Sequence, residues 1–86
     1  MSQRPMSDTR ETPAKVVDAK GEYCPKPIIE IARAIKEVEL GDLVLLLATD
    51  PGVHSDIPAW CKAMGHELVR IGDSGSVVEA LVRRAK

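Results

Sequence analysis

The spacing of apolar positions along this 86-residue chain changes several times, and each change predicts an element of secondary structure. Lys15–Ala19 contains adjacent valines and is followed by Gly21, which is typical of a short strand. After Cys24-Pro25-Lys26-Pro27, apolar residues recur every three or four positions and predict an amphipathic helix; they are Ile28, Ile31, Ala32, Ile35 and Val38. Gly41-Asp42 ends this unit.

An unbroken apolar run, Leu43–Ala48, predicts a central strand that is covered on both faces. The turn residues Asp50-Pro51-Gly52 stop it. A second helix follows, with Ser55 or Asp56 as the candidate cap and Gly65 as a left-handed C-terminal cap. Its apolar face is predicted to consist of Ile57, Trp60, Cys61 and Met64.

The last third of the chain predicts a hairpin. His66–Ile71 and Ser76–Val82 have strand character, and Gly72-Asp73-Ser74-Gly75 lies between them. The order is therefore β-α-β-α-β-β. Because βαβ crossovers are right-handed, both helices are expected on one face of a four-stranded mixed sheet, in an α/β two-layer sandwich. The other face lacks a helical cover and is a candidate docking surface for a partner or a second copy, unless long side chains cover it.

The first residues differ from the rest in having no apolar period. Residues 1–13 are polar and contain two prolines, so we expect a disordered tail, followed by one domain over residues 14–86. No apolar stretch reaches the ~20 residues of a membrane-spanning helix, and the opening residues do not have the pattern of a secretory signal. Two cysteines without an export signal indicate reduced thiols in the cytoplasm.

The charge balance and the aromatic content of the chain argue against one class of function, the binding of nucleic acid. Twelve basic and thirteen acidic side chains give a formal net charge of −1, and aromatic residues make up only 2% of the chain. Nucleic-acid-binding proteins usually show a clear basic excess, so direct binding of nucleic acid is not expected. The predicted core is aliphatic.

Cys24 is the residue with the clearest chemical potential. It precedes Pro25, and proline is favoured in the first turn of a helix, so the thiol is predicted at or just before the N-cap with free N–H groups nearby. That position stabilises an anion by only about 0.3–1 kcal/mol, less than one pKa unit. Lys20 and Lys26 would favour a thiolate further, whereas Glu22 would oppose it.

No histidine lies near Cys24 in the sequence to act as a base, so repeated acyl chemistry fits this site poorly. A persulfide is more acidic than a thiol and needs less help to ionise. The local pattern therefore fits a sulfur atom carried on Cys24, rigidly presented by two prolines. A cysteine that only caps the helix for packing reasons is the alternative.

Structural roles are predicted for the other residues that could carry chemistry. Cys61 shares the apolar helix face and is expected to be a buried thiol. The two cysteines form no C-x-x-C pair, and neither His54 nor His66 has metal-ligand spacing, so no metal or cofactor is expected. Trp60 is expected to pack in the core first and to bind a partner second.

The segment Asp18–Pro27 resembles the D-x-x-G-x-x-C-P-x-P signature of TusA/SirA-like sulfur carrier proteins. Blocks of similar residues follow in the same order, namely Gly41-Asp42, Thr49-Asp50-Pro51-Gly52, Asp56-Ile57, Trp60-Cys61 and Gly65-His66-Glu67-Leu68. The resemblance covers about Lys15 to Val82. One departure is Glu22, which lies where relatives usually carry an apolar residue.

The resemblance implies a sandwich like the C-terminal domain of a translation initiation factor. It also implies that Cys24 accepts sulfane sulfur from a cysteine desulfurase or rhodanese-like donor and passes it to an acceptor protein. The acceptor would serve tRNA 2-thiolation, molybdenum cofactor supply or sulfur oxidation. Such a protein is a stoichiometric carrier rather than a turnover enzyme, and we expect a monomer. Gly21, Pro25, Lys26 and Pro27 would support the site.

Two other functions stay open at this stage. A regulatory or partner-binding module would use Cys24 only as a helix cap. An RNA-associated domain is suggested by fold analogy alone, and fold does not determine function. The net charge and the scarcity of aromatic residues argue against RNA binding.

Overall fold

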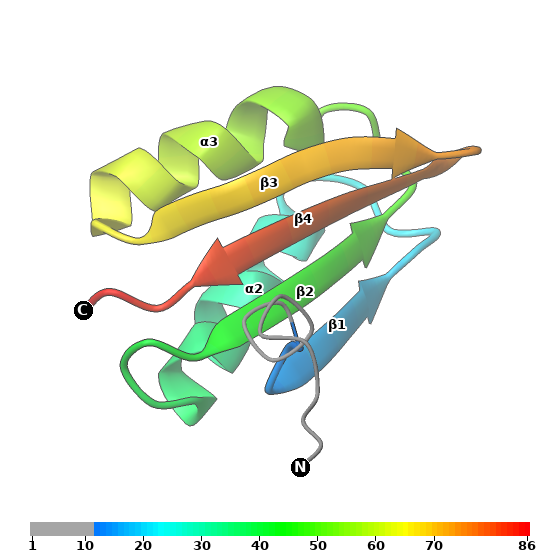
Figure 1. Ribbon diagram of the computed structural model, residues 1–86. Helices are drawn as coiled ribbons and strands as arrows, with labels where there is room; N and C mark the ends of the chain where they lie inside the picture. Colours follow the sequence, from blue (N-terminus) through cyan, green and yellow to red (C-terminus); the bar gives the residue numbers. More distant parts are fainter. Residues whose placement is uncertain (1–11) are drawn as a thin grey trace, which may run out of the picture.

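The computed structural model describes residues 12–86, so most of the predicted tail, residues 1–11, lies outside the described residues. The chain follows the predicted β-α-β-α-β-β order (Figure 1). The elements are β1 (Lys15–Ala19), α2 (Lys26–Ala34), the 3₁₀ helix η1 (Ile35–Glu37), β2 (Leu43–Ala48), α3 (Val53–Met64), β3 (Glu67–Ser74) and β4 (Val77–Arg83).

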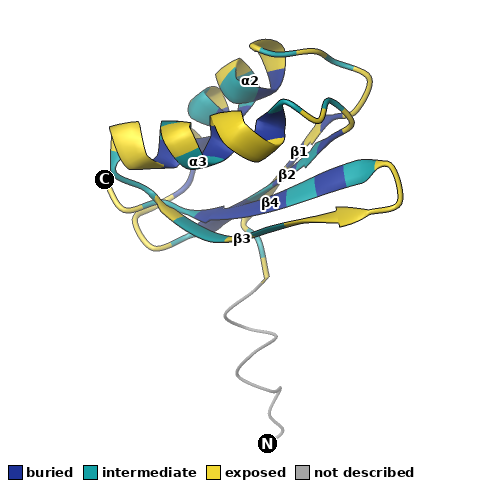
Figure 2. Ribbon diagram, turned by 90° about the horizontal axis from the view of Figure 1, so that it is seen from above, coloured by how far each residue is buried: buried dark blue, intermediate teal, exposed yellow. Residues whose placement is uncertain are grey.

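The strands form one mixed sheet in the order β1-β2-β4-β3. β1 and β2 are parallel, with Val17 opposite Leu46, as expected for strands joined through a helix. β4 is antiparallel to both of its neighbours and separates β2 from β3. Both helices lie on the same face of the sheet, which confirms the two-layer α/β sandwich (Figure 2).

The core fills the space between the helices and the sheet. It is aliphatic, as predicted, because alternate strand residues such as Val44, Leu46 and Ala48 point toward the buried Ile31 and Ile57 of the helices. The helix-free face of the sheet is also apolar. Leu45 and Leu47 on it are half-buried, and Val16 is 52% exposed. Its role as a docking surface stays a prediction.

The start of α3 differs from the prediction, since neither Ser55 nor Asp56 caps it. The helix begins at Val53, and its N-cap, Gly52, makes no side-chain cap hydrogen bond. The turn replaces the cap: the N–H groups of Val53 and His54 donate to the carbonyls of Asp50 and Pro51. Main-chain oxygens of the turn thus satisfy the first donors, which lets the helix start earlier.

The apolar face of α3 was predicted correctly except at its end. Ile57 and Cys61 are buried and Trp60 is half-buried, but Met64 is 51% exposed. Met64 is the last residue of the helix, where the chain turns back through Gly65, so fewer neighbours cover it.

The hairpin is tighter than predicted. β3 continues to Ser74, which pairs with Val77, so only Gly75 and Ser76 form the loop. Gly75 has φ +65°, which suits a two-residue hairpin turn with glycine at its first position. Among the described residues, no helix has the length and apolar character required to cross a membrane.

The left-handed cap at Gly65 is confirmed, and it generates a stability prediction. Gly65 has φ +81°, and a Cβ placed there would lie 2.8 Å from Cε of Lys86. We expect Gly65→Ala to lower the free energy of unfolding by about 1–2 kcal/mol in urea denaturation. Gly72→Ala is the control, because a Cβ on Gly72 would meet no atom within 4 Å. Equal midpoints for the two variants would contradict the prediction.

Candidate functional site

Cys24 lies in the loop between β1 and α2. This loop is at the end of the sheet where the parallel strands β1 and β2 have their carboxyl ends. Because these strands are parallel and adjacent, the loops that follow them meet at the same edge. Gly21, with φ +84°, turns the chain after β1, and its N–H group donates to Oγ1 of Thr49 at 2.9 Å. This contact ties the Cys24 loop to the loop after β2.

The Asp50 carboxylate forms the second connection between the loops. Its Oδ2 accepts the N–H of Cys24 at 2.7 Å, and its Oδ1 accepts the N–H of Gly52 at 3.0 Å. These hydrogen bonds, from Cys24 first, lower the pKa of Asp50 below its ordinary value. At neutral pH an ionised carboxylate is therefore hydrogen-bonded to the main chain of Cys24.

The N-terminus of α2 confirms the placement of Cys24 but not its expected surroundings. Pro25 is the N-cap, so Cys24 immediately precedes it through a cis peptide bond, and Pro27 is buried at the second helical position. The predicted free N–H groups are largely missing. The two prolines have none, and the N–H of Lys26 donates to the carbonyl of Tyr23 at 2.9 Å. The helix also has no side-chain cap hydrogen bond, so Cys24 does not cap it.

The Cys24 side chain is half-buried and packs against the core. Gly52 lies beside it, because a Cβ on Gly52 would be 3.7 Å from the Cys24 sulfur. Burial, followed by hydrogen bonds with the Asp56 and Asp50 carboxylates, raises the pKa of the Cys24 thiol to about 12. The expectation that the helix N-terminus and nearby lysines favour a thiolate was wrong for the free protein.

The two lysines that were expected to favour a thiolate, Lys20 and Lys26, interact with other carboxylates. The ammonium of Lys20 lies 3.9 Å from Oδ2 of Asp18. Lys26 is exposed and lowers the pKa of Glu22, in opposition to the groups that raise it. The charges that set the pKa of Cys24 therefore come from the loop after β2 and from α3, not from residues next to Cys24 in the sequence.

Glu22 was expected to oppose a thiolate, but its main partner is another carboxyl group. A side-chain hydrogen bond with Glu30 raises the pKa of Glu22, and partial burial raises it further. One of its oxygens, Oε1, is shielded from solvent and has no hydrogen-bond partner among the described residues. Glu22 and Glu30 thus form a carboxyl pair that favours binding a proton.

The other sequence candidates have structural surroundings. Cys61 is buried as predicted, its pKa is raised to about 11 by burial, and neither cysteine forms a disulfide. His54 is exposed, with its Nε2 2.7 Å from Oδ1 of Asp73. His66 lies against Trp60 with ring centroids 5.3 Å apart. Within residues 12–86, no group of three His, Cys, Asp or Glu side chains could hold a metal ion.

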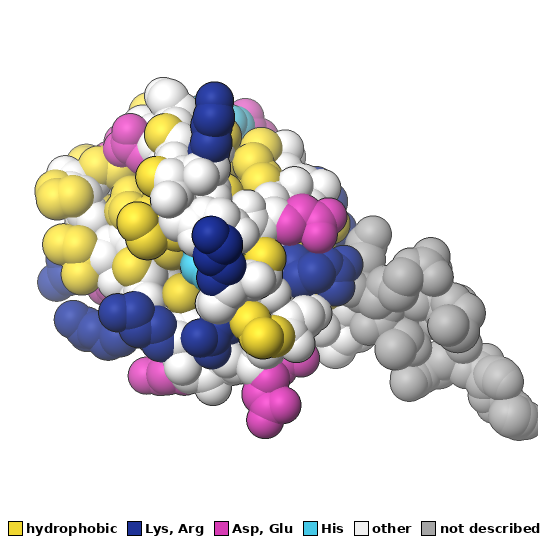
Figure 3. Space-filling model, turned by 90° about the vertical axis from the view of Figure 1, so that its left-hand side faces the viewer, with side chains coloured by type: hydrophobic (Ala, Val, Ile, Leu, Met, Phe, Trp, Pro, Cys, Tyr) yellow, Lys and Arg dark blue, Asp and Glu magenta, His cyan; other side chains and the backbone are white. Residues whose placement is uncertain are grey.

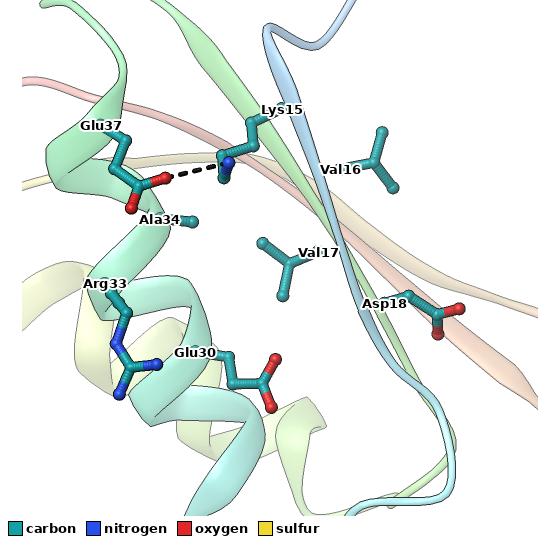
Figure 4. A pocket seen from close by; sticks show the side chains of 8 residues that line it. All are labelled: Lys15, Val16, Val17, Asp18, Glu30, Arg33, Ala34 and Glu37. Carbon is teal, nitrogen blue, oxygen red and sulfur yellow. Dashed lines mark ion pairs between the residues drawn. The ribbon is translucent and has the colours of Figure 1, made fainter.

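A separate hollow of about 240 Å³ lies between β1 and α2 (Figure 4). Lys15 and Glu37 form an ion pair of 2.9 Å at its rim, and Glu30 and Arg33 also line it. Cys24 does not line this hollow. Its mixed charges largely compensate one another, so it adds no group to the thiol site.

Sequence reasoning missed the acidic half of the site. Asp50 was interpreted as a turn residue, which the family resemblance would put near the Cys24 end of the molecule, and Asp56 as a candidate helix cap. Neither was assigned to the site, although the structure brings both carboxylates to the Cys24 sulfur. One available signal could have located Asp50. The predicted parallel pairing of Lys15–Ala19 with Leu43–Ala48 already implies that the residues after each strand meet at one edge.

The chain is similar to known proteins of one family. Residues 15–84 match the family described as "Sulfurtransferase TusA". The chain is 41% identical over 71 residues to a "Putative sulfur carrier protein" of Archaeoglobus fulgidus, a match that covers 83% of this chain and 97% of that protein. It is 39% identical over 70 residues to "Putative sulfur carrier protein YrkI" of Bacillus subtilis, which covers 81% and 93% of the two chains.

A solved structure shows the same fold. The crystal structure of a SirA-like protein from Desulfitobacterium hafniense has a TM-score of 0.73 and 23% sequence identity. The match covers 84% of this chain and 99% of that chain. The β-α-β-α-β-β sandwich is therefore shared over nearly the whole of that chain.

The acidic surroundings of Cys24 generate a reactivity prediction. In a Cys61→Ser background, we expect Asp56→Asn to accelerate alkylation of Cys24 by iodoacetamide at pH 8 by roughly tenfold. Below the thiol pKa, each unit of pKa changes the thiolate fraction about tenfold. Asp73→Asn removes an exposed carboxylate on β3 and serves as the control. An unchanged rate in Asp56→Asn would show that the Asp56 carboxylate does not raise the pKa of Cys24.

The carboxyl pair generates a pH prediction. The folded-state pKa of Glu22 is raised above its ordinary value of 4.5, so ionised Glu22 weakens the fold at pH values above that raised pKa. We expect Glu22→Gln to raise the urea midpoint at pH 7, with a gain that shrinks as the pH falls through about 4.5. Glu39→Gln, at an exposed position, is the control. A gain independent of pH would exclude the carboxyl pair as its cause.

Proposed function

This chain belongs to the TusA sulfurtransferase family, and we propose that it is a sulfur carrier that holds sulfane sulfur as a persulfide on Cys24. The observation that carries this proposal is the position of the Cys24 thiol. It is partly exposed at the edge of the sheet, between two loops that the Asp50 carboxylate joins. Cys61, the other thiol of the chain, is buried and only 3% exposed.

Loading on Cys24 is a thiol exchange with a persulfide donor. The Cys24 thiolate attacks the outer sulfur of the donor persulfide, which forms a new S–S bond to Cys24. The bond between that sulfur and the donor cysteine breaks, and its electron pair stays on the donor thiolate. The proton lost by Cys24 can be taken up by that thiolate. Sulfur moves without net oxidation, and delivery to an acceptor thiol repeats the same steps.

The acidic surroundings of the thiol suit a carrier more than an enzyme. With its pKa raised to about 12, the Cys24 thiol is protonated at pH 7. The free protein is therefore slow to react with oxidants and stray disulfides. Efficient loading then requires the docked donor to bring a positive charge or a base to the sulfur, which couples reactivity to the correct partner.

The donor that fits this chemistry is a protein that carries its own persulfide, of the cysteine desulfurase or rhodanese-like class. The acceptor is a protein with a thiol that can attack the outer sulfur held on Cys24. Tyr23 and Ile29 are candidates for contact with both, because they are 79% and 51% exposed on either side of the Cys24-Pro25 turn. tRNA 2-thiolation, molybdenum cofactor supply and sulfur oxidation remain the candidate destinations of the sulfur.

Sulfur loading tests this function directly. The protein is incubated with a cysteine desulfurase and cysteine without reductant, and its intact mass is measured. We expect wild type and Cys61→Ser to gain the mass of one sulfur atom, which dithiothreitol then removes. Cys24→Ser should gain nothing under the same conditions.

A rhodanese with thiosulfate provides a second arm, because the donor class is part of the proposal. Loading from either donor that depends on Cys24 supports the carrier function. Loading of Cys24→Ser to the wild-type level would show that the site is elsewhere. No loading of the wild type by either donor would contradict the carrier function itself.

A further inference from the structure

The end of the helical layer farthest from Cys24 carries a second hollow, of about 300 Å³. We call it the Trp60 pocket. Its apolar lining includes Ile35, Trp60 and Met64, and its charged lining consists of Lys36, Arg84 and Lys86. Figure 3 faces this end of the molecule and shows hydrophobic side chains with Lys, Arg and His side chains among them. No residue of the Cys24 site lines it.

The two lysines of this pocket pair with no acidic side chain of residues 12–86. Among residues 12–86, no carboxylate side chain forms an ion pair with Lys36, Arg84 or Lys86. Two main-chain groups hold Arg84 in place: its Nη1 donates to the Val38 carbonyl at 2.6 Å, and its Nε donates at 2.7 Å to the main-chain oxygen of Lys86, which belongs to the terminal carboxylate. The ammonium groups of Lys36 and Lys86 therefore remain available to an incoming anion.

The positive charges around the pocket also act on His66. Its Nδ1 accepts the N–H of Ala85 at 3.2 Å, and its ring lies against Trp60. Burial lowers the pKa of His66, and the charges of Arg84 and Lys86 lower it further. The pocket therefore combines an apolar floor with a rim of Lys and Arg side chains, and no acidic side chain lines it.

The size of the pocket indicates what can occupy it. Its volume is at the lower limit of cavities that enclose a drug-sized molecule, about 300 Å³. A hollow of this size accommodates an apolar side chain from a protein surface, and tryptophan, methionine and arginine are all enriched at protein interfaces. Charge complementarity requires acidic groups next to that side chain.

We infer that the Trp60 pocket binds an acidic segment of a partner protein, with one apolar side chain of the segment inserted beside Trp60 and Met64 and flanking carboxylates against Lys36 and Lys86. This surface extends the proposed carrier function. A partner held here leaves Cys24 free, because α2 and α3 both start near the thiol and both end at the pocket. Docking and sulfur transfer thus occupy opposite ends of the helical layer.

Trp60 provides a direct optical probe, since it is the only tryptophan in the chain. The ligand is a blocked synthetic peptide in which one leucine is flanked by aspartates. We expect a saturable change in Trp60 fluorescence, with NMR shifts confined to the pocket. The Lys36→Gln/Lys86→Gln double variant should bind roughly fivefold more weakly, as the loss of two exposed charge contacts implies. Met64→Glu should weaken binding at least as much.

Matched controls separate this site from general charge effects. Lys62→Gln removes an exposed lysine of α3 outside the pocket, and Val16→Glu places a carboxylate at a position as exposed as Met64, 52% against 51%. Both should bind the peptide like the wild type. Peptides with serine in place of leucine, or with lysine in place of aspartate, should not bind.

Three results would overturn the inference. They are no saturable change at millimolar peptide, equal binding by the double lysine variant, and preferential binding of a single-stranded RNA oligonucleotide at the same residues. The last would assign the pocket to base stacking on Trp60 instead. A sulfur donor that contacts only the Cys24 end of the protein should load Met64→Glu as well as the wild type. Loss of peptide binding with normal sulfur loading would therefore contradict the pocket inference and leave the carrier function intact.

Discussion

The structure around Cys24 depends on one carboxylate that accepts two main-chain N–H groups from different loops. Asp50 receives the N–H of Cys24 and that of Gly52, and so joins the loop after β1 to the start of α3. Without it, two donors at the edge of the sheet would lose their partner, at a cost typical of unsatisfied buried polar groups. The same contact fixes a negative charge beside the sulfur. The position of the thiol and its high pKa therefore have a common cause.

The Asp50 carboxylate thus contributes to two properties that a sulfur carrier needs, an accessible thiol and a low reactivity. Its thiol must be reachable by other proteins, yet it must not react with every oxidant it meets. Partial exposure of Cys24 provides access, whereas burial and the Asp50 and Asp56 carboxylates keep the thiol protonated. A helix N-terminus with free N–H groups would have had the opposite effect. Two prolines and the Tyr23 carbonyl remove most of that influence.

The fold also separates tasks in space. Both helices start near the thiol and end at the Trp60 pocket, so a single layer connects the proposed transfer site with the proposed partner surface. The thiol end is acidic and the pocket end is basic. Partners of different charge can therefore be recognised at opposite ends of one small domain.

Much of the fold was predictable because local signals, namely apolar runs, apolar periodicity and turn glycines, determine its elements. The bounds of Lys15–Ala19 and Leu43–Ala48 and the left-handed cap at Gly65 agree with the structure. Predictions failed at the two ends of α3, where the main-chain path rather than the residue pattern decides the outcome. Carbonyls of the Asp50–Gly52 turn replace the expected side-chain cap of α3, and position at the end of the helix exposes Met64.

The same distinction applies to the site. Cys24 was singled out as the candidate site from its place before Pro25 and from the resemblance to the family signature, since both are local features. Its ionisation was not predictable, because the groups that control it are 26 and 32 residues away in the chain, in Asp50 and Asp56. Charges adjacent in sequence, such as Lys20 and Glu22, instead interact with Asp18 and Glu30. Sequence proximity was a poor guide to electrostatic proximity here.

The central claim is that Cys24 is where this protein carries sulfur, and locating the sulfur on the native chain tests it most directly. The protein is isolated from cells under alkylating conditions, digested, and its sulfane sulfur assigned to a residue by peptide mass spectrometry. The account predicts an alkylated persulfide on the peptide that contains Cys24. Persulfide found on Cys61 alone, with Cys24 recovered only as the alkylated thiol, would contradict it.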